Sequence, residues 1–168
     1  MNHRVRNLTH AAIIAALYAV LTHLQNLLLP GSASWAIQCR FTEALCVLAF
    51  FTPAAIQGLT VGCLLFNLSF AAALPLDWVL GTLATFFSAL SMRFLRNVRL
   101  FRLPIPGLLM PALWNAILVG WELTVYIGGS FAINALYVAL GELIVLLTLG
   151  LGLYWVIRDR HLDKRLFG

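Results

Sequence analysis

One arginine and one glutamate open an apolar run in the stretch Ala36-Ile37-Gln38-Cys39-Arg40-Phe41-Thr42-Glu43-Ala44-Leu45. Arg40 and Glu43 are three residues apart, so they can pair along one face of a helix. The flanking sequence is membrane-like, and ionisable groups inside a membrane usually face a bundle interior or a wet cavity. Two interpretations stay open: a structural ion pair, or a pair at the mouth of a ligand pocket in a small integral membrane protein.

The composition places most of the chain in lipid. Of its 168 residues, 62% are hydrophobic and 10% are charged, whereas about a quarter of the residues of a soluble domain are charged. A chain of this length has room for about six helices of roughly 20 residues, the length that crosses a bilayer. We therefore predict an all-α integral membrane protein with a single domain over residues 1–168.

Proline, glycine and polar residues divide the apolar sequence into six segments. Turn signals stand at Leu29-Pro30-Gly31, Thr52-Pro53 and Gly128-Gly129-Ser130. The segments are too long for strands and do not alternate as barrel strands do. Six transmembrane helices are expected over about residues 8–29, 38–51, 54–73, 76–95, 107–127 and 132–157, the second being short for a full span.

Ten of the eleven lysine and arginine residues fall on one side of this six-helix arrangement, and Arg40 is the exception. Basic residues concentrate in cytoplasmic loops, so both termini are predicted to be cytoplasmic. This distribution explains the net charge of +5 by contact with the membrane surface and without nucleic acid.

Four acidic residues fall in the opposite, outer half: Glu43, Asp77, Glu122 and Glu142. They come from four different helices, which indicates a shared cavity open to the outside. Asp77 is also a plausible helix cap, and Asn67, near the outer end of the third helix, is a similar candidate. Glu142 is expected to contact either a ligand or a structural partner.

The fifth helix carries Asn115, Val119, Glu122 and Tyr126 on one face, with Trp114 beside it. A carboxylate, an amide and aromatic rings suit a planar ligand rich in hydrogen-bond donors. Hydrogen bonding between helices is the alternative interpretation. No histidine or cysteine cluster indicates a metal site.

The first helix carries a stripe of small residues, Ala11, Ala15 and Ala19. Stripes of this kind let helices approach closely in lipid. These alanines are expected either to dock another membrane subunit or to pack within this chain.

Five sequence blocks along nearly the whole chain carry a resemblance to a known family. They are Arg40-Phe41-Thr42-Glu43-Ala44-Leu45, Pro53-Ala54-Ala55-Ile56-Gln57-Gly58-Leu59-Thr60-Val61-Gly62-Cys63 with Asn67, Asp77-Trp78-Val79-Leu80-Gly81-Thr82-Leu83-Ala84-Thr85, Pro111-Ala112-Leu113-Trp114-Asn115-Ala116, and Gly141-Glu142. Together they resemble the QueT-like queuosine-precursor transporters, which are substrate-binding (S) components of energy-coupling factor (ECF) transporters.

The resemblance implies a six-helix S-component bundle in the prokaryotic cytoplasmic membrane. Such a protein captures a queuosine precursor, preQ1 or a related 7-deazaguanine, from outside. It implies assembly with a transmembrane coupling protein and two cytosolic ATPases, which hydrolyse ATP. The chain itself is then a transporter subunit and not an enzyme, with no cofactor and no metal of its own.

Two segments acquire expected roles from the resemblance. In related S components, alanines four residues apart on the first helix dock the coupling protein, and this chain keeps that spacing twice in Ala11-Ala12-Ile13-Ile14-Ala15-Ala16. The loop after the first helix often gates the pocket, which assigns the gate to Pro30, Gly31 and Trp35.

The residues support the same ligand class independently. PreQ1 carries an aminomethyl cation and a guanine-like donor edge, which four acids and one base suit. The expected substrate-binding residues are Arg40, Glu43, Asn67, Asp77, Trp114, Asn115, Glu122, Tyr126 and Glu142, with Arg40 and Glu43 at the rim and Glu122 and Glu142 holding the base.

Other functions remain open at this point. The chain has no GxxxxGK[ST] motif, so it cannot power transport alone. An S component for a different vitamin or nucleobase is the main alternative. A membrane enzyme with paired carboxylates lacks an HExxH-type metal motif and an evident nucleophile–base pair. A purely structural membrane subunit is the third possibility.

Overall fold

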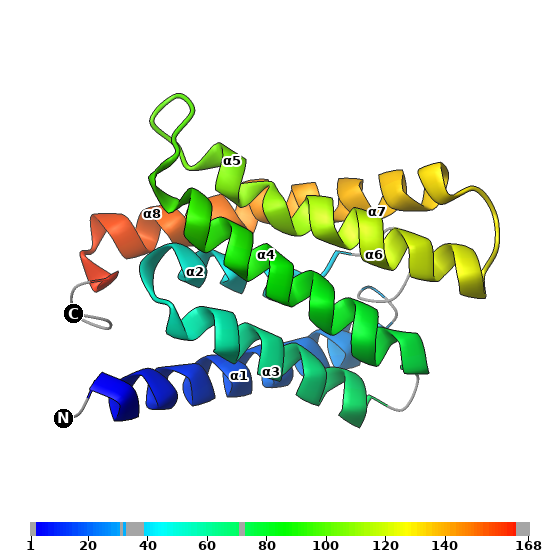
Figure 1. Ribbon diagram of the computed structural model, residues 1–168, viewed down its shortest axis with the longest axis horizontal. Coiled ribbons are helices and arrows are strands. Elements are labelled where there is room, and N and C mark those ends of the chain that lie inside the picture. The colour runs from blue at the N-terminus through cyan, green and yellow to red at the C-terminus, as the bar shows by residue number, and fades with distance from the viewer. Residues whose placement is uncertain (1–2, 31, 33–38, 71–72, 164–168) are drawn as a thin grey trace.

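The computed structural model describes residues 3–30, 32, 39–70 and 73–163, and this part of the chain is all-helical. The long helices lie side by side, roughly along the longest dimension of the molecule (Figure 1). The helical elements are α1 (His3–Leu28), η1 (Phe41–Val47), α2 (Leu48–Phe51), α3 (Ala54–Ser69), η2 (Asp77–Gly81), α4 (Thr82–Phe94), η3 (Leu95–Asn97), α5 (Ile105–Leu108), α6 (Met110–Tyr126), α7 (Phe131–Val145), η4 (Leu146–Gly150) and α8 (Leu151–Asp159).

Four continuous helical stretches are long and apolar enough to cross a membrane: His3–Leu28, Asp77–Asn97, Ile105–Tyr126 and Phe131–Asp159. Two further apolar helices, Phe41–Phe51 and Ala54–Ser69, are shorter. The 16 residues of α3 span about 24 Å at 1.5 Å per residue, less than the roughly 30 Å of a hydrocarbon core. The all-helical membrane class is therefore confirmed, while six complete spans stay a prediction.

The breaks between helices follow from local chemistry. Thr52 is extended (φ −136°, ψ 137°) because it precedes Pro53, and it separates α2 from α3. Gly128 and Gly129 have φ angles of 84° and 86° and form the turn between α6 and α7. Such positive φ values suit glycine, which has no Cβ.

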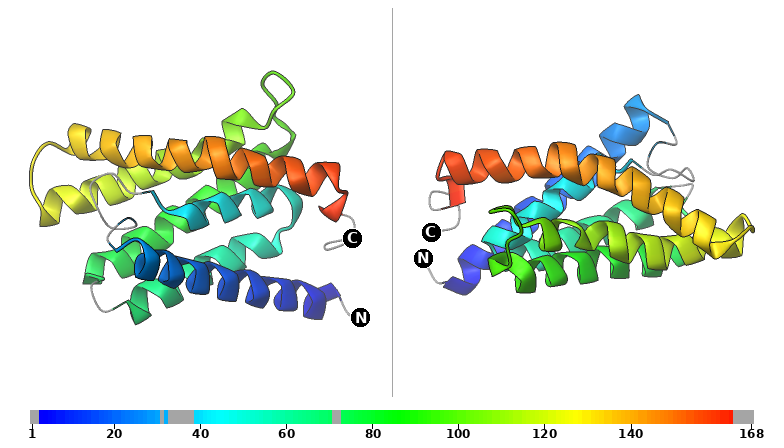
Figure 2. Two further views of the ribbon diagram at one scale, coloured as in Figure 1. Left: turned by 180° about the vertical axis from the view of Figure 1, so that it is seen from behind. Right: turned by 90° about the horizontal axis from the view of Figure 1, so that it is seen from above.

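The topology gives the molecule two distinct ends. The beginning of α1, the α2–α3 break, the connection between η3 and α5, and the end of α8 lie at one end (Figure 1). The α6–α7 turn lies at the other end, and so does the end of α3 (Figure 2). The arginine-rich connection thus shares an end with the beginning and the end of the described chain, as the charge pattern predicts. Which end faces the cytoplasm stays a prediction.

Helices α1 and α3 pack closely through glycine. A Cβ added to Gly58 would lie 2.7 Å from the carbonyl oxygen of Ala11, and one added to Gly62 would lie 2.7 Å from that of Ala15. Ala11 and Ala15 are consequently buried, with 6% and 5% of their surface exposed. For Ala11 and Ala15 this packing favours the alternative of packing within the chain, because α3 covers them. Docking of a partner subunit by the alanine stripe stays a prediction.

The apolar core lies between α1, η1, α3, α4 and the η4–α8 region. Tyr18, Val47, Leu59, Met92 and Leu146 are all buried in it. Two of the cysteines, Cys46 and Cys63, are buried in the same cluster as small packing residues. A core of this kind fixes the helix ends that carry the polar residues described next.

Candidate ligand-binding site

A cavity of about 260 Å³ lies among the ends of α3 and α6 and the beginning of η2. These helix ends are far from the beginning of α1 (Figure 2). Five of the residues predicted from sequence to bind a ligand line this cavity: Arg40, Asn67, Asp77, Glu122 and Tyr126. The other lining residues are apolar. Val119 lies on the helix face that the sequence analysis named, and the remaining five were missed: Phe70, Ala73, Leu74, Leu123 and Ile127.

Hydrogen bonds of Asp77 and its neighbour Leu76 connect this helix start to α3 and α6 at the cavity wall. Its Oδ2 accepts a hydrogen bond from the backbone N–H of Leu74 at 2.7 Å, the return contact of a capping box. Its backbone carbonyl accepts a hydrogen bond from Asn67 Nδ2 at 2.8 Å. The hydroxyl of Tyr126 accepts one from the Leu76 N–H at 3.1 Å. Asp77 therefore both holds the start of its helix and lines the cavity.

The helix that starts at the cavity is irregular. Residues Asp77–Gly81 form a π-helical turn, a feature common at functional sites. A Cβ on Gly81 would lie 3.2 Å from Asn67 Nδ2 and 3.9 Å from Arg40 Nη1. The absence of a side chain at Gly81 thus leaves room for the guanidinium group of Arg40 beside the cavity.

Arg40 is the basic residue of the cavity wall. Only 6% of its surface is exposed. It lies within electrostatic range of Glu43, Glu122 and Glu142. Carboxylates stabilise a buried guanidinium group, so the single arginine of the cavity wall interacts electrostatically with acids from three helical elements.

Glu43 is satisfied inside the protein. It is fully buried, and its two oxygens accept hydrogen bonds from the Tyr18 hydroxyl at 2.8 Å and from Cys46 Sγ at 3.2 Å. Glu43 does not line the cavity. These contacts support the structural interpretation of Glu43.

Glu122 and Glu142 are different. Glu122 is 2% exposed and Glu142 is fully buried. Neither carboxyl group accepts a hydrogen bond from any residue that the structure describes. The buried amide nitrogen of Asn115, Nδ2, likewise donates to none of them. Buried polar groups without partners are rare and point to a role beyond folding. Glu122 faces the cavity, where Asp77 is a second acid close enough to interact with it.

Trp114 lies elsewhere. Its Nε1 donates a hydrogen bond to Ser91 Oγ at 3.0 Å, and its ring stacks on Phe87 with centroids 4.9 Å apart. It is not a lining residue of the cavity. Its predicted ligand contact stays a prediction, while its observed contacts join α6 to α4.

Of the predicted gate residues, Pro30 is exposed, whereas Gly31 and Trp35 lie outside the described residues. Gln25, missed by the sequence analysis, ties both ends of this connection to α1. Its Nε2 donates to Ser32 Oγ at 3.0 Å and to the Cys39 carbonyl at 2.7 Å, and its Oε1 accepts from the Phe41 N–H at 2.9 Å.

A sequence signal for Gln25 and Tyr18 exists. Both share a helix face with Ala11 and Ala15, at the spacing of 11, 15, 18, 22 and 25 that is buried in the structure. Polar residues on a buried stripe need partners, and here the partners lie on η1 and in the connection before it.

Four long apolar helices define the class, a multi-pass membrane protein, and the cavity with polar and apolar lining residues is its candidate site for a small molecule. A family model described as QueT transporter matches residues 8–159. The chain belongs to the QueT transporter family, which confirms the resemblance of its sequence blocks, and it is a membrane transporter and not an enzyme. Neither a curated protein nor a solved structure matches the chain.

Proposed function

We propose that this chain is the substrate-binding S component of an ECF transporter and that it captures preQ1 or a related 7-deazaguanine. Membership of the QueT transporter family supports the transport role. The observation that carries the choice of ligand is the pair of buried carboxyl groups, Glu122 and Glu142, left without hydrogen-bond donors by the described part of the chain.

The chemistry of the site matches the donors of such a ligand. A carboxylate accepts two parallel N–H bonds, as the edge of a guanine-like base offers them. A second acid can receive the aminomethyl cation, and Asp77 stands next to Glu122 at the cavity wall. The cavity of about 260 Å³ is near the lower limit of small-molecule sites, roughly 300 Å³, as suits a ligand of two fused rings.

The two ends of the molecule support an outward-facing site. The cavity lies at the end opposite the arginine-rich connection. Basic loops face the cytoplasm as a rule. In this proposal the cavity therefore faces the outside, and both termini lie on the cytoplasmic side of the prokaryotic cell membrane.

The partner subunits are a coupling protein and two ATPases. We place the docking surface on Ala12 and Ala16, which are exposed on α1 and four residues apart, whereas Ala11 and Ala15 are covered by α3 and Ala19 is half-buried. In this proposal the ATPases use ATP and this chain binds no cofactor. Replacing Ala12 and Ala16 with tryptophan is expected to abolish copurification with the coupling protein, while Leu21→Trp, on another exposed face of α1, keeps it.

Isothermal titration calorimetry of the purified chain tests the ligand. We expect preQ1 to bind at least about tenfold more tightly than guanine, since only preQ1 adds a cation for the second acid. Riboflavin and biotin serve as control ligands of other S components and are not expected to bind. Binding of either control without binding of any deazaguanine would overturn the proposed substrate.

The second candidate is an S component for an unmodified nucleobase. The same carboxyl groups favour it, because a plain guanine edge also pairs with a carboxylate. Equal affinity for guanine and preQ1 would decide for this candidate and would leave the family assignment untouched.

A further inference from the structure

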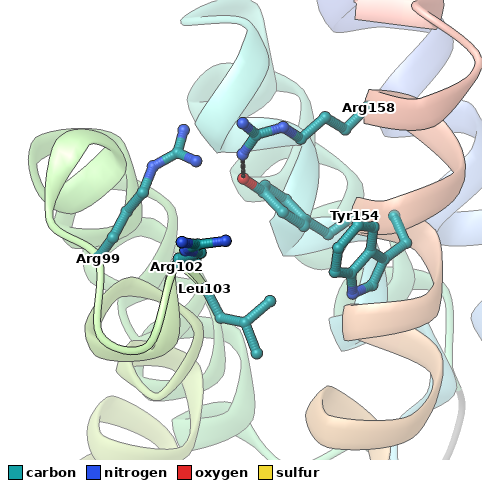
Figure 3. A pocket seen from close by; sticks show the side chains of 6 residues that line it. Arg99, Arg102, Leu103, Tyr154 and Arg158 are labelled. Carbon is teal, nitrogen blue, oxygen red and sulfur yellow. Dashed lines mark hydrogen bonds between the residues drawn. The ribbon is translucent and has the colours of Figure 1, made fainter.

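A second pocket lies at the other end of the bundle, next to the end of α8. It has a volume of about 500 Å³. Arg99, Arg102 and Leu103 line it from the connection between η3 and α5, and Tyr154, Trp155 and Arg158 line it from α8. Figure 3 shows the side chains of Arg99, Arg102 and Arg158 directed toward the same space. This pocket has no part in the proposed ligand site.

The connection that carries two of these arginines has a defined shape. The backbones of Leu100 and Leu103 pair through hydrogen bonds of 2.9 and 3.0 Å. The two residues between them, Phe101 and Arg102, have φ angles of 51° and 67°. Left-handed conformations are unfavourable for residues with side chains, so they persist where they serve a purpose. Here the tight turn directs Arg102 toward α8 (Figure 3).

The charges in this pocket are uncompensated. None of the described lining residues is acidic. Arg158 Nη1 donates to the Tyr154 hydroxyl at 2.7 Å, and its guanidinium carbon lies 5.9 Å from the tyrosine ring centre. Arg99 and Arg102 form no ion pair with any residue within 3–30, 32, 39–70 or 73–163. Three guanidinium groups around one space repel one another and favour an anion between them.

The surroundings point to lipid as the source of that anion. The helices run along the length of the bundle, and the 98–104 connection projects sideways from its end (Figures 1 and 2). A membrane surface would run in this sideways direction. Phe101 at the tip is 87% exposed, and Trp155 is 50% exposed. Aromatic residues with adjacent arginines are typical of the membrane–water interface.

We propose that the pocket formed by Arg99, Arg102, Tyr154 and Arg158 binds the phosphate headgroup of an anionic phospholipid. The arginines hold the phosphate, the tyrosine orients Arg158, and Phe101 and Trp155 contact the acyl region. The bound lipid links the 98–104 connection to α8 at one face of the membrane.

Native mass spectrometry of the full chain, released from mixed phosphatidylglycerol–phosphatidylcholine nanodiscs, tests this site. We expect retained phosphatidylglycerol to be preferred by roughly a hundredfold, since each arginine near an anionic surface contributes about a factor of five. The variant Arg99→Gln/Arg102→Gln/Arg158→Gln is expected to lose the preference. The matched variant Arg4→Gln/Arg6→Gln/Arg160→Gln removes three charges from the same end and is expected to keep it.

The alternatives have their own outcomes. Equal loss in both triple variants would show diffuse attraction and overturn the site. Protection from unfolding by inorganic phosphate, without retained lipid, would assign the pocket to a free anion instead. Unchanged lipid retention together with lost assembly with the coupling protein would assign it to a protein partner. Thermal unfolding and binding of preQ1, expected to be unchanged in both variants, control for folding.

Discussion

Two regions of this molecule contain buried glutamates with opposite surroundings. On η1, Glu43 is fully buried, and both of its oxygens accept hydrogen bonds, from Tyr18 and from Cys46. On α6 and α7, Glu122 and Glu142 are as deeply buried, yet no described residue donates to them. The difference separates a carboxyl group that holds the fold from carboxyl groups free to hold something else.

This difference has a thermodynamic consequence. Breaking the bond to a satisfied carboxyl group strands its partner and destabilises the protein. Replacing an unsatisfied carboxyl group with an amide of the same shape leaves no protein partner without its hydrogen bond, so it costs little folding free energy. Folding and ligand binding should therefore respond in opposite ways in the two regions. Three substitutions test this difference, and a fourth tests Trp114, which belongs to neither region.

The largest effect is expected for Glu122→Gln. We expect the affinity for preQ1 to fall about a hundredfold, because a buried charged hydrogen-bond partner is lost, while the ligand-free protein becomes no less stable. Calorimetry measures the first and thermal unfolding in detergent the second. Asp159→Asn, at the far end of the bundle, removes the same charge and should change neither. Unchanged preQ1 affinity of the Glu122 variant would show that Glu122, like Glu43, has only a structural role.

Glu142→Gln is expected to have the next largest effect. Glu142 does not line the cavity, whereas Glu122 does. We therefore expect a smaller loss of preQ1 affinity than for the Glu122 variant, about tenfold. Thermal stability without ligand should again be unchanged or higher. The control is Thr148→Val, on the exposed side of η4. A marked drop in stability with normal affinity would place Glu142 in the same group as Glu43.

Tyr18→Phe tests the satisfied region. Without the phenolic hydroxyl, Glu43 Oε1 loses its donor inside the core, and the free energy of unfolding should fall by about 1–3 kcal/mol. The affinity for preQ1 should stay within about threefold. Tyr137→Phe, at an exposed tyrosine of α7, serves as the matched control. A Tyr18 variant that is fully stable but binds poorly would contradict the structural role of Glu43.

The smallest effect is expected for Trp114→Phe. The substitution removes the bond to Ser91 but keeps an aromatic ring beside Phe87. Stability should fall by about 1 kcal/mol, and calorimetry should show unchanged preQ1 affinity. The conservative Ser91→Ala variant should reproduce this loss of stability. A tenfold weaker ligand affinity would instead restore Trp114 to the binding site, as its sequence position predicts.

Much of the fold could be predicted from the sequence because its signals are local. Thr52-Pro53 and Gly128-Gly129 interrupt the helices where they stand, since proline and glycine act on their own backbone. The site was partly predictable: the six-helix arrangement placed Asp77 and Glu122 in the same half of the membrane, and both line the cavity. The apolar wall was not, since Phe70 and Ile127 look like ordinary apolar residues in an apolar chain.

The sequence by itself determined that the protein is helical, embedded in membrane and a member of the QueT transporter family, because composition, breaks and family blocks are properties of the chain. Only the tertiary structure decided which buried acids are satisfied and which alanines are covered. Tyr18 donates a hydrogen bond to Glu43, 25 positions further along the chain. The close approach of α3 at Gly62 covers Ala15 of α1. Hydrogen bonds and close packing act over a few ångströms in space, so separation along the chain does not reveal them.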